Sequence, residues 1–430
     1  MTGNQRGARR TGIAAWCLYD FANSAYPTIV TTFVFAAYYT QGIAATPAAG
    51  TTHWGLMISL SAVAVAVLGP ILGAVADRIG RRKPWLAGFS LLCIAATAML
   101  WFARPEPGYA VLALVLVAIA SLGFELGMVF YNAMLNDIAP PDRIGRISGW
   151  GWGLGYGGGL LALAVALYAF IQPAEAPFGL DKATAEHIRA TAPLAALWFA
   201  VFALPLLFLT PDRPATGMPF GRAVAEGMAS LAATLRNIRG HRTVFRFLLA
   251  RMFYVDGLTT LFAFGGIYAA GTFGFTLEQV ILFGIALNVT AGLGAAGFAW
   301  VDDWIGPKPT IVIALFALIA LGAASVLVES PSWFWAVGIG LGIFVGPAQA
   351  ASRSLMVRLA PPELETEMFG LYALSGKATA FLGPLTLALV TAAFDSQRAG
   401  MATILVFFAL GLALLMGVKA PVPRSAGRRN

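Results

Sequence analysis

The sequence predicts an all-α membrane protein with twelve transmembrane helices, and its composition and hydropathy pattern support this fold class. Of its 430 residues, 59% are hydrophobic and only 11% are charged, whereas roughly a quarter of the residues of a soluble protein are charged. The mean hydropathy is +0.77. Apolar runs long enough to cross a bilayer as helices lie at approximately 13–40, 54–76, 84–103, 109–135, 146–171, 191–209, 245–271, 277–301, 309–328, 333–357, 367–393 and 400–418.

The distribution of cations predicts the orientation of these spans. Of the 28 Lys and Arg residues, 21 lie in the terminal tails or in the loops after even-numbered spans, and 4 lie in the loops on the opposite side. Short loops rich in Lys and Arg stay in the cytoplasm. Both termini are therefore expected in the cytoplasm. Because topology explains the net charge of +8, we expect the lipid bilayer, and no nucleic acid, as a partner.

A polar segment and an internal repeat predict the domain organisation. The segment 210–244 separates six spans from six spans, which gives an N-terminal bundle at 1–209, a cytoplasmic central loop, and a C-terminal bundle with its tail at 245–430. The sequence Ala-Pro-Pro-Asp at 139–142 recurs as Ala-Pro-Pro-Glu at 360–363. We therefore expect two parallel six-helix repeats, with a binding site between them near the middle of the membrane.

The sequence lacks the usual patterns of enzymes and metal sites. Cys17 and Cys93 fall inside apolar runs, which is typical of buried thiols. The three histidines are far apart in the sequence, so no metal-ligand spacing exists. No G-x-x-x-x-G-K-[ST] phosphate-binding loop is present. We expect no cofactor, no metal and no enzymatic activity, and an ion gradient rather than ATP as the energy source.

Several segments resemble known transporters. The turn Gly73–Lys83 reads G-A-V-A-D-R-I-G-R-R-K and closely resembles the loop between the second and third helices of the major facilitator superfamily. Other segments resemble the branch that contains the autophagy-related vacuolar effluxer of fungi and its bacterial relatives: Trp16–Tyr26, Phe130–Pro140, Phe253–Gly257, Ser352–Pro361 and Phe369–Lys377. The resemblance implies the major facilitator fold and secondary transport. The fungal relatives are associated with efflux of amino acids from the vacuole.

Ionisable groups inside the first-half spans are candidates for a binding site, because burying each in a membrane costs about 2.5–3.5 kcal/mol. Asp20 shares a helix face with Asn23 and is either a substrate or proton site or an interhelical hydrogen-bonding group. Glu125 lies near the middle of its span, and Asn132 continues its face. Glu125 is either a proton carrier or the permanent partner of a cation.

The second half contributes four more ionisable groups. Asp256 is a candidate for lining the transport cavity, and Lys377 either holds an anionic group such as a carboxylate or pairs with Glu125. Arg251 is either a gate residue or extends its head group to the membrane surface. Arg353 fits a gate or a clamp between helices better than a ligand site.

The cation-rich turn after the second span also predicts a gate. Its cations need partners, and the start of span 11 offers three glutamates; its aspartate suits the positive N-terminal end of that span. The turn is therefore expected to latch the two halves together. The expected gate consists of Asp77, Arg78, Gly80, Arg81 and Arg82 with Glu363, Glu365 and Glu367.

These features predict a secondary active transporter that works by alternating access. We expect a monomer that exports a small polar or zwitterionic solute, such as an amino acid, and that uses protons. The composition, rich in Ala, Gly and Arg, indicates a bacterial inner-membrane protein. The apolar, aromatic-rich spans leave a lipid-like or amphipathic drug-like substrate as an alternative, and a transport-inactive sensor or scaffold is a further one.

Overall fold

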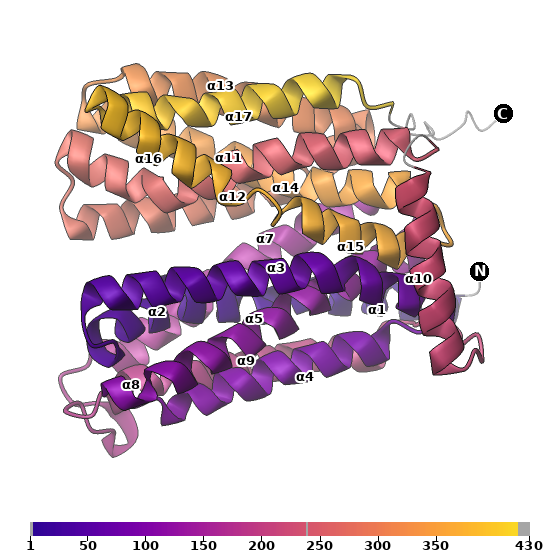
Figure 1. Cartoon of the computed structure of the whole chain (residues 1–430), viewed down its shortest axis with the longest axis horizontal. Coiled ribbons are helices and arrows are strands. Elements are labelled where there is room, and N and C mark those ends of the chain that lie inside the picture. Colours follow the sequence, from indigo (N-terminus) through magenta and orange to yellow (C-terminus); the bar gives the residue numbers. More distant parts are fainter. Residues whose placement is uncertain (1–2, 238–239, 420–430) are drawn as a thin grey trace. The chain divides into compact units, whose positions relative to one another are not determined.

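The computed structural model describes residues 3–237 and 240–419, and the expected cytoplasmic C-terminal tail at 420–430 lies outside this range. The described residues form helices and connecting loops, without strands (Figure 1). Ten helical segments in this part of the chain are long and apolar enough to cross a membrane. Two of the twelve expected spans, the first and the eleventh, are interrupted.

The chain forms two compact units, and the first combines Met1–Leu68, Ile79–Ile138 and Leu154–Gly217. Its helices pack around buried aromatic side chains. They are α1 (Gly3–Asn23), α2 (Phe35–Tyr38), most of α3 (Pro47–Ile79), α4 (Lys83–Met99), α5 (Ala110–Ala133), α6 (Leu135–Ile138), the second part of α7 (Ile144–Val165), α8 (Glu186–Arg189) and α9 (Thr191–Leu209).

The second unit combines Gly69–Arg78, Ala139–Gly153 and Met218–Asn430. It therefore includes the end of α3 and the start of α7. Its other helices are α10 (Phe220–Arg236), α11 (Arg242–Phe273), α12 (Leu277–Ile305), α13 (Pro307–Leu327), α14 (Pro331–Leu359), α15 (Glu365–Ser375), α16 (Leu382–Phe394) and α17 (Gln397–Met416).

Two short segments, Gly69–Arg78 and Ala139–Gly153, group with the second unit because glycines allow close backbone contacts. A Cβ atom on Gly73 of α3 would lie 2.4 Å from the carbonyl oxygen of Thr366. A Cβ atom on Gly149 of α7 would lie 2.5 Å from the carbonyl oxygen of Ala295. The backbones are in close contact at both places, which groups these short segments with the second unit. The organisation as two six-helix repeats stays a prediction.

The first expected span is not one continuous α-helix. After α1 ends at Asn23, a π-helix runs over Pro27–Phe33, and a second π-helix follows α2 at Tyr39–Ile43. Pro27 has no backbone N–H to donate. The hydroxyl of Ser24 donates to the carbonyl of Asp20 at 2.7 Å, which is a side-chain interaction that bends helices.

The eleventh expected span, 367–393, is also broken. Figure 1 shows α15 and α16 as two helices joined by a non-helical stretch, which covers residues 376–381. Gly376 ends α15, and Pro384 lies in the first turn of α16, where its missing N–H costs nothing. Broken helices of this kind form binding sites near the middle of the membrane in transporters.

The central loop contains an amphipathic helix, although the sequence analysis treated 210–244 as a polar connection. Helix α10 runs crosswise to the long helices of its unit (Figure 1). Its buried stripe includes Ala223 and Gly227, and a Cβ atom on Gly227 would lie 3.0 Å from the backbone of Val75 at the end of α3. The loop is therefore docked on the cation-rich turn region.

Candidate functional site

The break between α15 and α16 brings together three predicted site residues within the second unit. Asp256 of α11 is 3% exposed, and its Oδ2 accepts the N–H of Gly383 in the first turn of α16 at 3.1 Å. Arg251 of α11 reaches the other side of the break, at the end of α15. Lys377 is half-buried within the break itself.

Arg251 is fixed to the last turn of α15. Its Nη1 donates to the carbonyl of Tyr372 at 2.7 Å and to the hydroxyl of Ser375 at 2.8 Å. Its guanidinium carbon lies 3.5 Å from the centre of the Tyr372 ring, a cation–π contact. The last carbonyls of a helix carry partial negative charge, so a cation is favourable there.

Charges of both signs therefore flank the break. A carboxylate lies at the start of α16, and two cations, Arg251 and Lys377, lie at the end of α15 and just beyond it. Such an arrangement can bind a solute that carries both a positive and a negative group. No cluster of His, Cys, Asp and Glu suited to a metal ion occurs among the described residues.

The first-half candidates lie on α1 and α5 in the first unit. Asp20, Asn23 and Asn132 are buried, and Glu125 is half-buried. The amide of Asn23 approaches the sulfur of Met128 on α5 at 3.5 Å. This burial and this contact are compatible with both roles expected for the first-half residues, binding and helix packing.

A reciprocal aromatic pair, which the sequence analysis did not single out, positions α1 against α5. The indole N–H of Trp16 donates to the carbonyl of Tyr131 at 3.1 Å, and the hydroxyl of Tyr131 donates to the carbonyl of Trp16 at 3.0 Å. The two rings stack with centroids 4.4 Å apart. Only the W-x-L-Y-D and F-Y-N-A segments that carry the family resemblance could have indicated this pair.

The predicted gate residue Asp77 caps α15. Its Oδ1 accepts the N–H of Thr366 at 3.1 Å and its Oδ2 accepts the N–H of Glu367 at 2.9 Å. Both N–H groups belong to the first turn of α15, where the helix provides no acceptor. Glu365 and Glu367 are buried there, and Oε2 of Glu367 accepts the hydroxyl of Ser230 from α10 at 3.1 Å.

Two cations of the turn have partners that differ from the glutamates that we expected. Arg82 is 1% exposed and pairs with Asp137 at 2.6 Å. Arg81 is exposed and lies 4.0 Å from Asp212. Both cations belong to the first unit, and so do their partners Asp137 and Asp212. Glu363 is exposed at the surface of the second unit.

The central loop also supplies contacts to the turn at 73–83. Oδ1 of Asp212 accepts the N–H of Arg82 at 3.0 Å, and its Oδ2 accepts the N–H of Lys83 at 3.3 Å, so Asp212 caps α4. Gly80 has a φ of +91°, which favours glycine, and a Cβ there would lie 2.4 Å from the carbonyl oxygen of Pro214. No local pattern in the sequence indicates these long-range contacts.

A second cap of the same type lies at the start of α7. Oδ1 of Asp303 accepts the N–H of Arg146 at 3.1 Å, and the Arg146 side chain pairs with Asp303 at 3.2 Å. Next to it, Arg353 donates to the hydroxyl of Ser148 at 2.9 Å and to its carbonyl at 2.6 Å. Arg353 thus clamps α14 to α7, which is one of the two roles that we expected.

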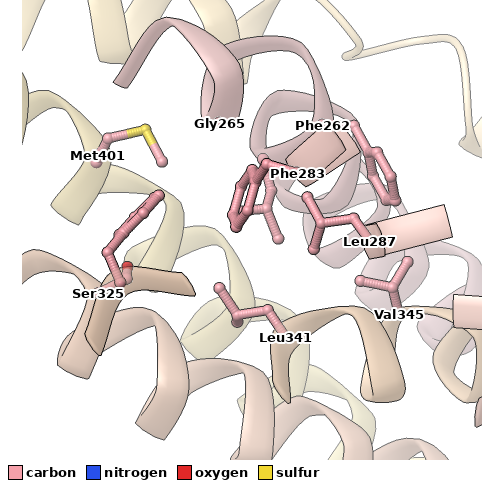
Figure 2. Close-up of a pocket in the computed structure, with 10 residues that line it drawn as sticks. Phe262, Gly265, Phe283, Leu287, Ser325, Leu341, Val345 and Met401 are labelled. Atoms are coloured by element: carbon pink, nitrogen blue, oxygen red, sulfur yellow. The ribbon is translucent and has the colours of Figure 1, made fainter. Parts of the chain in front are cut away.

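A small apolar cavity of about 20 Å³ lies inside the second unit. Figure 2 shows its lining, in which Ser325 supplies the hydroxyl group and the labelled neighbours are aromatic and aliphatic side chains. The lining comes from α11, α12, α13, α14 and α17. The Ser325 hydroxyl already donates to the carbonyl of Gly322 at 2.7 Å, so the cavity suits an apolar group.

Comparison with known proteins identifies the family. A family model described as "Vacuole effluxer Atg22 like" matches residues 51–426. The chain belongs to this family. The resemblance drawn from the turn at 73–83 and the other segments is therefore confirmed.

Individual relatives agree with this assignment. The MFS-type transporter YxiO of Bacillus subtilis is 28% identical over 406 residues, which cover 93% of this chain and 93% of the relative. Autophagy-related protein 22 of Coccidioides immitis is 24% identical over 409 residues, which cover 79% of this chain and 68% of the relative.

Solved structures show the same fold. The proton:xylose symporter XylE matches with a TM-score of 0.77 at 13% identity, over 98% of each chain. The Escherichia coli fucose:proton symporter FucP matches with a TM-score of 0.66 at 15% identity, over 96% of this chain and 98% of that one. The chain is an integral, multi-pass membrane transporter of the major facilitator type and not an enzyme.

Proposed function

We propose that this transporter is a proton-coupled exporter of a small polar or zwitterionic solute, such as an amino acid. It works by alternating access as a monomer in a bacterial inner membrane, with both termini in the cytoplasm. The effluxer description of the family supports the direction of transport. The names of the two symporters of the same fold support coupling to protons.

The observation that carries the proposal is the set of charges at the break in the eleventh span. A zwitterion presents one ammonium and one carboxylate, and the break presents Asp256 with the cations Arg251 and Lys377. Discontinuous helices near the middle of the membrane form substrate and ion sites in other transporters. Asp20, Asn23, Glu125 and Asn132 are the proposed first-half contributors to binding.

Flux measurements test the substrate class. The purified full-length protein is reconstituted in liposomes, and uptake of radiolabelled amino acids is compared with uptake of amphipathic dyes under an imposed proton gradient. We expect gradient-driven uptake of at least one amino acid and its loss in Lys377→Ala. The Lys308→Ala variant is a matched control, because the ammonium of Lys308 donates to the carbonyls of Met416 and Val418 and not to the break.

The results separate the alternatives. Uptake that ignores the proton gradient would contradict coupling to protons, and unchanged uptake in Lys377→Ala would contradict its binding role. An absence of flux for every solute, together with a stoichiometric partner on pull-down, would favour the sensor or scaffold.

The apolar spans, together with the apolar lining of this small cavity, favour a second candidate substrate class, lipid-like or amphipathic molecules, for which the cavity would have to widen. Gly265 on α11 leaves open space toward which a larger side chain could extend, since nothing lies within 4 Å of a Cβ built there. Filling the cavity with Gly265→Leu should abolish dye transport if the cavity holds the apolar part of the substrate. Amino-acid transport that survives in this variant, without any dye transport in the wild type, would favour the first candidate.

A further inference from the structure

Asp256 lies deep within the longest described helix of the second half. It is fourteen residues from the start of α11 at Arg242, which corresponds to about 21 Å along the axis. Its side chain is nearly inaccessible, with 3% of the residue exposed. A carboxylate in this position needs compensating contacts, because an isolated buried charge is strongly unfavourable.

The two carboxylate oxygens of Asp256 have different surroundings. Oδ2 accepts the N–H of Gly383 at 3.1 Å, whereas Oδ1 is buried and has no hydrogen-bond partner among the described residues. The neighbouring hydroxyl of Thr260 donates to the Asp256 carbonyl at 2.8 Å and so is used by the backbone. One oxygen therefore has the capacity to take up a proton without breaking an existing hydrogen bond.

Gly383 allows α16 to approach this carboxylate closely. A Cβ atom on Gly383 would lie 2.1 Å from the Thr260 hydroxyl and 3.1 Å from Oδ1 of Asp256. Helix α16 begins at Leu382, so the Gly383 N–H has no acceptor within its own helix. The positive end of the helix dipole favours the ionised carboxylate, while burial favours the neutral acid.

The hydrogen bond joins α11 to a helix that can move separately. Residues 376–381 are not helical, so α16 is not a rigid extension of α15. A hydrogen bond to an ionised acceptor is about twice as strong as one between neutral groups. Protonation of Asp256 would weaken both this bond and the attraction to the helix dipole.

Few other charged groups lie where they could neutralise the Asp256 carboxylate in place of a proton. Helix α16 has no ionisable side chain. The charged or titratable residues on α11 and on the elements packed against it are Arg242, Arg246, Arg251, Tyr254 and Tyr268 on α11, Glu278, Asp302 and Asp303 on α12, Arg353 and Arg358 on α14, Glu365, Glu367 and Tyr372 on α15, Lys377 in the link and Arg398 on α17.

Three of these cations donate their hydrogen bonds to other acceptors. Arg251 donates to α15, Arg353 to Ser148, and Arg398 to the carbonyls of Val326 and Val328. Asp302 is equally buried, but its Oδ1 accepts the hydroxyl of Ser354 and lies 4.0 Å from Arg358. Asp302 also has one buried oxygen without a hydrogen-bond partner, Oδ2, but it has a cation within 4.0 Å, whereas no ion pair of Asp256 occurs among the described residues.

We propose that Asp256 is the proton-binding carboxylate of the transport cycle and that its ionised form fastens α16 to α11 through Gly383. Protonation releases α16, and the non-helical link at 376–381 absorbs the movement. This inference rests on the proposed proton-coupled function and selects one group from the three candidate carriers, Asp20, Glu125 and Asp256.

The protonation step is tested without any substrate. Infrared difference spectra of the purified protein in nanodiscs are recorded between acid and alkaline pH, in the carbonyl-stretch region of protonated carboxyl groups. We expect one band to disappear at alkaline pH in the wild type and to be missing in Asp256→Asn. The band should persist in Asp20→Asn and Glu125→Gln, which are matched controls. Loss of the band in either control instead of Asp256→Asn would overturn the assignment.

The movement of α16 is tested with spin labels. Labels at Leu389 on α16 and Ile267 on α11, which are both exposed positions, report the distance between these helices. We expect one narrow distance at alkaline pH, a second population at acid pH, and no pH response in Asp256→Asn. In Gly383→Ala the infrared band should remain while the narrow population is lost.

Two outcomes contradict the inference. A wild-type distance distribution that is identical at both pH values excludes a proton-controlled contact. A distribution that responds to sodium at constant pH assigns the site to a sodium ion instead. Both readouts are independent of flux, so a failure of the proposed substrate class leaves them interpretable.

Discussion

Single charges in this protein differ widely in what their removal should cost, and the turn after α3 provides a direct comparison. Arg82 is 1% exposed, donates to the carbonyl of Ala133 at 2.7 Å and pairs with Asp137 at 2.6 Å. Arg81, its neighbour, is exposed and lies 4.0 Å from Asp212. Breaking a buried pair leaves an uncompensated charge, whereas an exposed pair contributes little.

We therefore predict that Arg82→Ala destabilises the protein by about 3 kcal/mol, near the lower end of the range for breaking a buried pair because Asp137 is partly exposed. Arg81→Ala should cost less than about 1 kcal/mol. Thermal unfolding of both variants in the same detergent measures the difference. Equal melting temperatures would show that burial of Arg82 has no energetic consequence.

At the residue scale, the sequence predicted the ionisable groups because their cost in a membrane marks them. Asp256, Arg251 and Lys377 stand out in apolar runs. Their grouping around one break, and the use of Asp137 and Asp212 as partners for the turn, could not be predicted. These contacts join residues far apart in the chain, and hydropathy carries no information about such pairs.

At the scale of elements, glycines determine how closely the helices pack. In α7, a Cβ atom on Gly158 would lie 2.2 Å from the carbonyl oxygen of Phe21 on α1, whereas nothing lies within 4 Å of a Cβ on Gly157. Glycine is abundant in the sequence, with 48 residues, and small residues let helix backbones approach closely. Which glycines make contact depends on the rotation of each helix, and this is fixed by packing.

These two neighbouring glycines give a matched prediction. Gly158→Ala should force α1 and α7 apart and destabilise the protein by about 1–3 kcal/mol. Gly157→Ala should be neutral or stabilising by up to about 1 kcal/mol, since alanine favours the helix more than glycine does. Detergent melting curves of both variants provide the test, and a larger loss in Gly157→Ala would contradict the packing shown by the structure.

Hydropathy also predicted most spans but not the interruptions. The runs at 13–40 and 367–393 are long and largely apolar, so their length predicted continuous helices. The breaks follow from Pro27 in the first case and from Gly376, Gly383 and Pro384 in the second. Glycine and proline are common in membrane helices, so their presence alone does not distinguish a break from a packing contact.

At the scale of the whole molecule, the contact between the end of α3 and the start of α15 should influence which transport state is populated. Asp77 satisfies two N–H groups of α15, and Gly227 of α10 packs on the same stretch of α3. We expect a state that opens this end of the molecule to break these contacts. Helix α10 would then belong to the same proposed gate as the turn.

We predict that Asp77→Ala shifts the population towards the state that is open to the cytoplasm, because the first turn of α15 loses its acceptors. A cysteine introduced at Ala74, which is 1% exposed, reports the opening by its labelling with a membrane-impermeant thiol reagent added from the cytoplasmic side. The native Cys17 and Cys93 are buried, so background labelling should be low.

Asp142→Ala is the control, since Asp142 is an exposed carboxylate that pairs with its neighbour Arg143 at 3.6 Å. Labelling should rise several-fold in Asp77→Ala and stay unchanged in Asp142→Ala, and equal labelling in both would remove Asp77 from the gate.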